Sequence, residues 1–86
     1  MTAELKTIEQ RMAAVDEVLR EVRAEIARAI AKHPPMNSPH EGYAVILEEL
    51  DELWIEVKAN NGRELSALEE AVQIAAMGVR YVTDLR

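Results

Sequence analysis

The sequence predicts an all-α protein with a long first helix followed by an antiparallel pair of helices. Apolar residues recur at three- and four-residue steps along most of the 86 residues, which is the spacing of one helix face. Two short segments rich in Pro, Asn or Ser, residues 33–39 and 60–62, divide this pattern into three parts. We interpret residues 1–86 as one small domain, and small domains often depend on oligomerisation for stability. We therefore expect a helical bundle formed by a dimer or a higher oligomer, such as a tetramer.

The first helix is expected to run from about Thr2 to Lys32. If unbroken, about 30 residues would extend ~45 Å, beyond the ~30 Å of each later helix, so part of its apolar face has nothing to cover within one chain. A kinked helix that folds back on itself is less favoured, because no Pro or Gly interrupts the segment. We expect a second chain to cover this helix-packing seam. The seam consists of Leu5, Ile8, Met12, Val15, Leu19, Val22, Ile26 and either Ala29 or Ile30.

The second helix is expected after two consecutive prolines that end the first one. Ser38 predicts its N-cap, Pro39 suits the first helical position, and Glu41 would complete a capping box with Ser38. From there to about Lys58 the pattern is amphipathic. One face holds Tyr43, Leu47, Leu50, Trp54 and Val57, and the other holds Glu41, Glu48, Glu49, Glu52 and Glu56.

The third helix is expected after Asn60-Asn61-Gly62, which has the residue types of a helix C-cap. Ser66 and Glu69 predict a capping box that would place Glu70 in the first turn. From Ala67 to Leu85 the segment is apolar around most of its circumference, which predicts the central helix of the bundle. Its one polar stripe is expected to face water or a polar cavity. The stripe consists of Glu70, Gln73, Met77, Arg80 and Asp84, with Glu69 at its edge.

Composition narrows the functional classes. The chain has no Cys, which excludes a disulfide framework and a thiolate metal site. The first residues lack the regions of a signal peptide, and no apolar run approaches the length of a bilayer span, so we expect a cytoplasmic protein without a membrane partner. A net charge of -6 argues against binding to a nucleic acid polymer. His33 and His40 form no recognisable zinc pattern and are not assigned to a metal.

Glu48, Glu49 and Glu52 form the most distinctive polar group. Carboxylates three and four residues apart leave a helix as neighbours, and such like charges are mildly destabilising, an effect that a divalent cation would reverse. Because a short turn joins this helix to the next, Glu70 can be aimed at the same point, as in the metal sites of helical bundles. The simpler alternative is a solvated acidic face, which is what most charge runs on helices are.

These residues resemble a family signature, EExxE on one helix followed by ExxD at the start of the next. It is the signature of the MazG-like all-α nucleoside triphosphate pyrophosphohydrolases, and the resemblance covers residues 40–85. Glu48, Glu49, Glu52 and Glu70 match it, whereas Gln73 stands where the family usually has Asp. The resemblance implies an enzyme that uses Mg²⁺, with Mn²⁺ as a substitute, to cleave a nucleoside triphosphate to the monophosphate and pyrophosphate. The expected substrate is a deoxynucleotide.

Within this resemblance, each matching residue has an expected role. Glu49, Glu52 and Glu70 are expected to bind the cation, because hard carboxylate oxygens suit Mg²⁺. Glu48 is expected to be a further ligand or the catalytic base that orients the attacking water. Gln73 would coordinate through its carbonyl oxygen and supply no charge.

Contacts to the phosphates of the substrate would need cationic side chains. The local candidates are Lys58, Arg63 and Arg80, the last because it shares a stripe with Glu70. The competing hypothesis is a non-catalytic helical dimerisation or adaptor module, or a degenerate member of the family, whose acidic face is solvated or binds a basic partner. Gln73 favours that alternative, since a degenerate enzyme would have lost a ligand.

Overall fold

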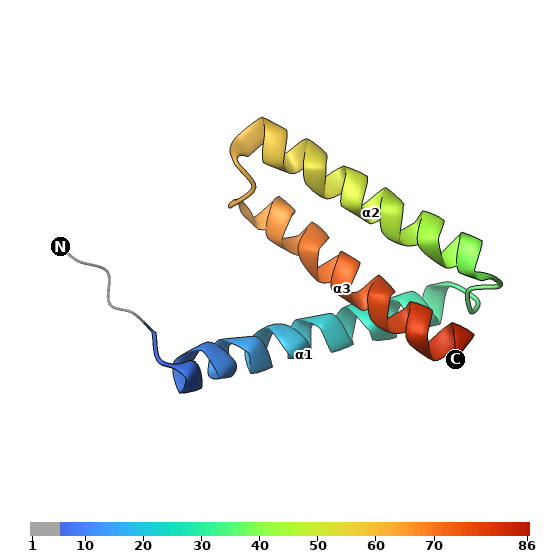
Figure 1. Cartoon of the computed structure of the whole chain (residues 1–86), viewed down its shortest axis with the longest axis horizontal. Helices are drawn as coiled ribbons and strands as arrows, with labels where there is room; N and C mark the ends of the chain where they lie inside the picture. The colour runs from blue at the N-terminus through green and yellow to red at the C-terminus, as the bar shows by residue number, and fades with distance from the viewer. Residues whose placement is uncertain (1–5) are drawn as a thin grey trace.

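The computed structural model describes residues 6–86, which form three α-helices and, within that range, no strand (Figure 1). Helix α1 is Ile8–Lys32, α2 is Pro39–Asn60 and α3 is Leu65–Leu85. Helices α2 and α3 run antiparallel and are joined by a short turn (Figure 1). The predicted all-α class, with a long helix before an antiparallel pair, is confirmed. None of the helices described has an apolar stretch long enough to cross a membrane.

Helix α1 begins later than the sequence pattern predicts. Thr7 is its N-cap, and its Oγ1 accepts a hydrogen bond from the backbone N–H of Gln10 at 3.1 Å. In return, the backbone N–H of Thr7 donates to Oε1 of Gln10 at 2.9 Å. This capping box satisfies N–H groups that a helix terminus leaves free, and it fixes the first turn at Ile8. The prediction that the helix includes Lys6 and Thr7 is therefore wrong. The part of that prediction before Lys6 lies outside the described residues.

The ends of α2 agree in part with the sequence prediction. Oγ of Ser38 accepts a hydrogen bond from the backbone N–H of Glu41 at 3.1 Å, as expected of an N-cap. The Glu41 carboxylate accepts a hydrogen bond from the Asn37 side chain, at 3.1 Å, instead of one from Ser38, so the expected capping box is only half formed. At the other end, Asn61 and Gly62 have φ values of 62° and 76°, which confirms the predicted left-handed C-cap.

The predicted capping box at the start of α3 is wrong. Its N-cap residue is Glu64, whose side chain makes no capping hydrogen bond. The Ser66 hydroxyl donates instead to Oε2 of Glu56 at 2.8 Å, and the Asn60 side chain donates to the same oxygen at 3.1 Å. These two bonds lower the pKa of Glu56 and tie the start of α3 to the end of α2. Glu70 consequently lies in the second turn of α3, not in the first.

Helix α3 is the central helix, as predicted. It packs against both α1 and α2, whereas α1 and α2 do not pack against each other within residues 6–86. Close approach of α2 to α3 depends on Gly42, where a Cβ atom would lie 2.5 Å from Cδ2 of Tyr81. The core lies where the three helices and the loop at 33–39 meet. Its buried members are Val22, Ala29, Met36, Ala76 and Met77.

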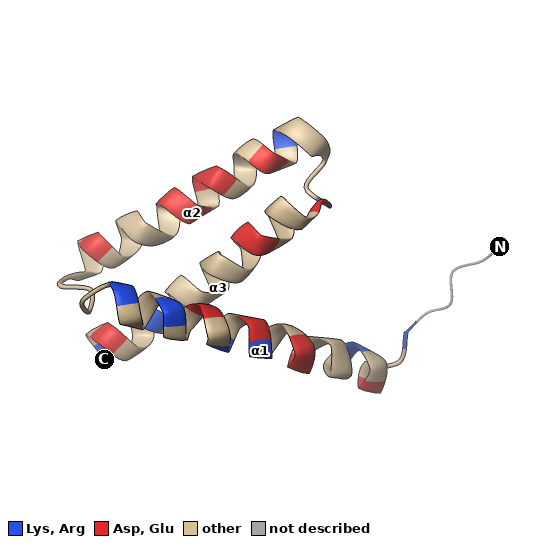
Figure 2. Ribbon diagram, turned by 180° about the vertical axis from the view of Figure 1, so that it is seen from behind, with Lys and Arg blue, Asp and Glu red and all other residues tan. Residues whose placement is uncertain are grey.

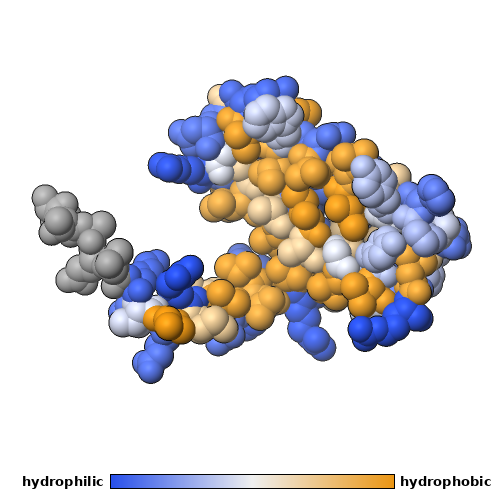
Figure 3. Space-filling model, in the orientation of Figure 1, coloured by the Kyte–Doolittle hydropathy of each residue, from blue (hydrophilic) through white to orange (hydrophobic). Residues whose placement is uncertain are grey.

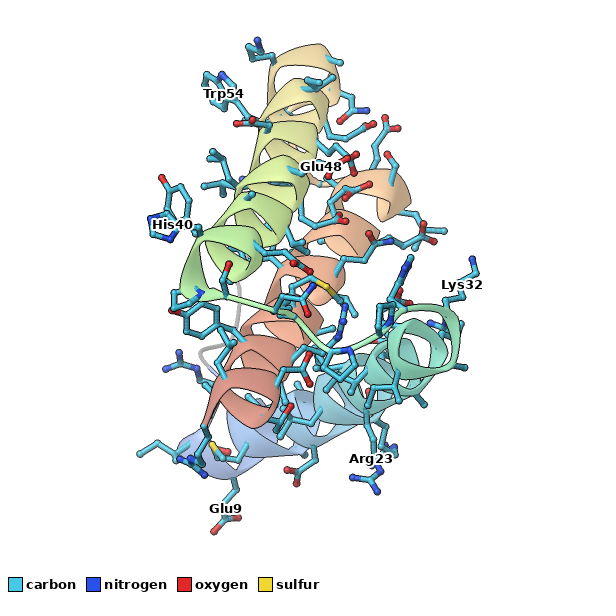
Figure 4. The ribbon with its side chains drawn as sticks, turned by 90° about the vertical axis from the view of Figure 1, so that its right-hand side faces the viewer. Glu9, Arg23, Lys32, His40, Glu48 and Trp54 are labelled. Carbon is cyan, nitrogen blue, oxygen red and sulfur yellow. The ribbon has the colours of Figure 1, made fainter. Side chains whose placement is uncertain are left out.

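The chain leaves much apolar surface uncovered. Tyr43 and Trp54, on the apolar face of α2, are 66% and 57% exposed, and Trp54 projects from the side of α2 opposite Glu48 (Figure 4). The side of α2 that packs on α3 is mixed: its partly buried residues include Val45, Ile46, Glu49, Leu53 and Glu56, whereas Glu41, Glu48 and Glu52 are exposed. Hydrophobic residues also gather along α1 and beside the hollow between α1 and the other helices (Figure 3). The exposed large apolar residues of α1 are Ile8, Met12, Val15, Val18, Leu19 and Ile30.

Candidate metal centre

Three carboxylates from two helices converge between α2 and α3. One oxygen each of Glu49, Glu52 and Glu70 lies within 4.8 Å of the other two. Glu49 and Glu52 leave α2 as neighbours because they are three residues apart. Glu70 faces them because the short turn after α2 brings the second turn of α3 alongside. In the described part of the chain, this is the only such group of three or more His, Asp or Glu side chains. We call it the carboxylate triad.

Two members of the carboxylate triad are partly shielded from water. Glu49 and Glu70 are partly buried, whereas Glu52 is exposed. Oε2 of Glu49 and Oε2 of Glu70 are buried, and no N–H or hydroxyl group of the described chain donates a hydrogen bond to either. Leaving a buried acceptor without a partner costs about 1–3 kcal/mol, and more for a charged group. Native structures contain few such atoms, so these two oxygens indicate a missing partner.

The surroundings of Glu49 raise the pKa of its carboxyl group from 4.5 to about 7. Burial of the carboxyl group is the largest cause, followed by the hydrogen bond that the protonated group makes with Glu70. The charges of Glu52, Glu70 and Glu48 then add to the shift. The pKa of Glu52 is also raised, chiefly by the hydrogen bond with Glu70 and then by the charge of Glu70. Near neutral pH the Glu49 carboxyl is therefore partly protonated, and a bound cation would displace that proton.

The carboxylate triad fits a hard divalent cation. Mg²⁺ binds oxygen ligands at about 2.1 Å, so two oxygens on one ion lie no more than ~4.2 Å apart. Oxygens already within 4.8 Å of one another can reach one ion by small side-chain rotations. Mg²⁺ also keeps several water molecules and leaves room for phosphate oxygens. A cation would supply the partner that the buried oxygens of Glu49 and Glu70 lack.

Glu48 and Gln73, the other two predicted site residues of the motif, lie beside the triad. Both line a cavity of about 780 Å³ together with Glu49. Glu48 is exposed, while Gln73 is partly buried and shares a face of α3 with Glu70, three residues earlier. The structure therefore brings Glu49, Glu52 and Glu70 together and places Glu48 and Gln73 at the adjoining cavity.

Of the three cations expected to contact phosphates, the structure brings Arg80 to this cavity. Lys58 lies nine residues after Glu49, about half a turn away around α2. Its Nζ is 5.5 Å from the centroid of the Trp54 ring. Arg63 follows α2 in the loop, where its backbone N–H donates to Asn61 Oδ1 at 3.2 Å. Lys58 and Arg63 do not line the cavity, so the structure does not bring them to the other site residues, and their contact with phosphates stays a prediction.

Sequence reasoning missed Arg28, Lys32 and His33, which also line the cavity. They belong to the end of α1 and the residue after it, where Figure 2 shows basic residues close to the start of α2. No spacing along the chain indicates this proximity, because α1 reaches the site by packing on α3. The only local signal was a basic last turn, which helices commonly have because cations complement the helix dipole.

Comparison with protein-family models, with curated proteins and with solved structures finds no match to this chain. Inference about function therefore rests on the triad and the adjoining cavity. The resemblance to the MazG-like pyrophosphohydrolases stays a prediction that Glu48, Glu49, Glu52 and Glu70 carry.

The raised pKa of Glu49 predicts how stability depends on pH when no divalent metal is bound. Its pKa is about 7 in the folded chain and near 4.5 when unfolded, so the folded state binds more protons between these values. Stability should therefore fall as the pH rises from about 4.5 through about 7, and then level off. Urea denaturation in EDTA at pH 5.5, 6.5 and 7.5 measures this dependence.

The matched variants are Glu49→Gln and Glu17→Gln. Each removes one carboxylate, but Glu17 is exposed on α1. Glu49→Gln should flatten the pH dependence, and Glu17→Gln should leave it as in the wild type. Equal pH dependence in the wild type and Glu49→Gln would show that the folded chain does not raise the pKa of Glu49.

Proposed function

We propose that this chain is a Mg²⁺-dependent nucleoside triphosphate pyrophosphohydrolase, with Mn²⁺ able to replace Mg²⁺. The reaction would convert a ribo- or deoxynucleoside triphosphate into its monophosphate and pyrophosphate. The observation that supports this most strongly is the convergence of Glu49, Glu52 and Glu70 within 4.8 Å. Release of pyrophosphate from nucleoside triphosphates, with and without Mg²⁺, is the experiment that tests the proposal.

In this proposal, Glu49, Glu52 and Glu70 hold the metal, and Glu49 gives up the proton that its raised pKa lets it hold. The bound ion would supply neutralisation of phosphate charge and a lowered pKa of the attacking water. Glu48 is exposed beside the triad and would orient that water or accept its proton. The adjoining cavity, about 780 Å³, is within the ~300–1,000 Å³ usual for small-molecule sites. Arg80 would contribute positive charge at its wall, and Gln73 an uncharged oxygen.

A second function is favoured by the uncovered apolar faces of α1 and α2. The chain would then be a non-catalytic dimerisation or adaptor module, with its acidic residues solvated or bound to a basic partner. Such a module has no need for buried oxygens of Glu49 and Glu70 that lack hydrogen-bond partners. That difference favours the enzyme, and stabilisation by Mg²⁺ separates the two hypotheses, because a solvated acidic face should barely respond to the ion.

We also propose that the chain assembles as a homodimer or homotetramer through the exposed part of the α1 seam, which consists of Ile8, Met12, Val15 and Leu19. At micromolar concentration, sedimentation should give two or four times 9.7 kDa. Leu19 is 56% exposed, and burying a Leu side chain at an interface contributes about 1.5–3 kcal/mol. Leu19→Asp should therefore weaken association by about tenfold or more.

The control for this prediction is Ala14→Asp, which adds the same charge to an exposed position that lies away from the seam. It should sediment as the wild type does. A wild-type chain that sediments as a monomer at micromolar concentration would contradict the proposed assembly.

A further inference from the structure

The cavity beside the carboxylate triad has walls of opposite charge. Helix α2 contributes acidic residues, including Glu48 and Glu49, whereas the end of α1 contributes Arg28 and Lys32, and α3 contributes Arg80. Figure 4 shows Lys32 and Glu48 on the same side of the molecule. The sequence pattern brings the acids together, but the cations come from two helices that meet only in the folded chain. We call Arg28, Lys32 and Arg80 the cationic wall.

Arg80 is the most informative member of the cationic wall because it is only 5% exposed. Its Nη2 donates to the carbonyl oxygen of Pro34 at 3.2 Å, and its Nη1 makes a weak contact with Sδ of Met77 at 3.5 Å. Asp84 lies 3.6 Å away, but its carboxylate also accepts a hydrogen bond from the backbone N–H of Met36 at 3.1 Å. Asp84 therefore offsets the charge of Arg80 only in part.

The guanidinium of Arg80 is not saturated by these contacts. Arginine offers five N–H donors, and the Nε of Arg80 is buried without any hydrogen-bond partner in the described chain. A buried cation with unused donors is costly, and such groups normally have an anionic or water partner. Because Arg80 lines the cavity, an anion bound there would be its natural partner.

The two exposed members of the cationic wall differ in how they are paired. Arg28 binds Glu25 one turn earlier on α1. Lys32 has no acidic partner within residues 6–86, where the only ion pairs are those of Arg28 and Arg80. Basic residues in a last turn can simply complement the helix dipole. That explanation covers Lys32, which lies in the last turn of α1. It does not cover Arg28, which lies one turn earlier, or Arg80, which belongs to another helix and lines the same cavity.

We propose that the cationic wall binds the phosphate chain of the substrate, with the metal-bearing triad at one end of the cavity and Lys32 and Arg80 beside it. This inference rests on the proposed function and adds to it a polyphosphate subsite that includes the end of α1. Arg28 contributes to the subsite by exchanging its contact with Glu25 for one with a phosphate oxygen. The forked donors of Arg and the point charge of Lys both suit phosphate oxygens.

The test uses inorganic tripolyphosphate, which carries the phosphate chain without a nucleoside. Its affinity for the whole chain is measured by calorimetry in the presence of Mg²⁺. The double variant Arg28→Gln/Lys32→Gln changes two exposed side chains and should leave the fold intact. It should weaken binding by about tenfold or more, since a hydrogen bond to a charged group typically contributes that much. Lys58→Gln removes a cation outside the cavity and should change the affinity less than twofold.

Arg80→Lys tests the buried member, because it keeps the charge and loses the fork. Circular dichroism establishes that the variant is folded, and its affinity for tripolyphosphate should fall. No binding of tripolyphosphate to the wild type, or equal losses in the double variant and Lys58→Gln, would overturn the subsite. Tripolyphosphate binding that depends on the cationic wall, in a chain that releases no pyrophosphate from any nucleotide, would uphold the subsite and reject the proposed function. Pyrophosphate release with an unchanged KM in the double variant would uphold the proposed function and reject the subsite.

Discussion

Glu49→Gln and Glu52→Gln are each expected to lower Mg²⁺-dependent pyrophosphate release by ~100-fold or more, because each removes one carboxylate of the triad. Glutamine keeps the size of the side chain, and neither residue belongs to the buried core. The helical fold should therefore persist. Without metal, Glu49→Gln should even be more stable at pH 7.5, by on the order of 1 kcal/mol, because a partly buried charge is removed. Circular dichroism and urea denaturation measure both effects.

The matched control is Asp51→Asn, which removes one negative charge from an exposed position of α2 outside the triad. It should retain wild-type activity. Mg²⁺ should raise the Tm of the wild type and of Asp51→Asn, since a ligand that binds only the folded chain stabilises it. It should have little effect on Glu49→Gln or Glu52→Gln. Full activity in either of these two variants would remove the triad from the mechanism.

Gln73→Asp is expected to tighten Mg²⁺ binding about tenfold in the absence of nucleotide, because it adds a fourth negative charge next to Glu70. With Gln73, the site has one charge fewer, and substrate phosphates would have to complete the coordination of the ion. Metal and nucleotide should then bind cooperatively in the wild type, and this cooperativity should decrease in Gln73→Asp. Calorimetric Mg²⁺ titrations at pH 7.5, with and without a nucleotide, measure both quantities.

Asparagine at position 73 is the control for side-chain length, because Gln73→Asn shortens the side chain as Asp does but adds no charge. It should not bind Mg²⁺ more tightly than the wild type. Indistinguishable Mg²⁺ affinities in the wild type and Gln73→Asp would place Gln73 outside the coordination sphere. The family motif would then extend only as far as Glu70.

Apolar spacing predicted the three helices because each segment repeats its pattern over many turns. It could not predict the start of α1. The apolar pattern continues back to Leu5, but the capping box of Thr7 and Gln10 fixes the first turn at Ile8. It also gave the wrong start for α3, because the Ser66 hydroxyl binds Glu56 on the preceding helix. In both places a polar contact that spacing does not reveal determines the boundary.

Amphipathicity divided α2 into an acidic and an apolar face, but it could not tell which face meets α3. In the folded chain, the side of α2 that meets α3 combines Val45, Ile46 and Leu53 with Glu49 and Glu56, so neither predicted face meets α3 as a whole. The triad itself could be predicted, because helical spacing and a short turn suffice to bring Glu49, Glu52 and Glu70 together. Arg28 and Lys32 could not, since their place beside the site depends on how α1 crosses α3.

We propose above all that the triad supports hydrolysis of nucleoside triphosphates with Mg²⁺. The most direct test is a pyrophosphate-release screen of the wild-type chain over the common ribo- and deoxynucleoside triphosphates. We predict release of pyrophosphate and a nucleoside monophosphate from at least one of them, dependent on Mg²⁺ or Mn²⁺ and abolished by EDTA and in Glu49→Gln. No pyrophosphate from any nucleotide in the presence of either metal would contradict the claim and favour the non-catalytic helical module.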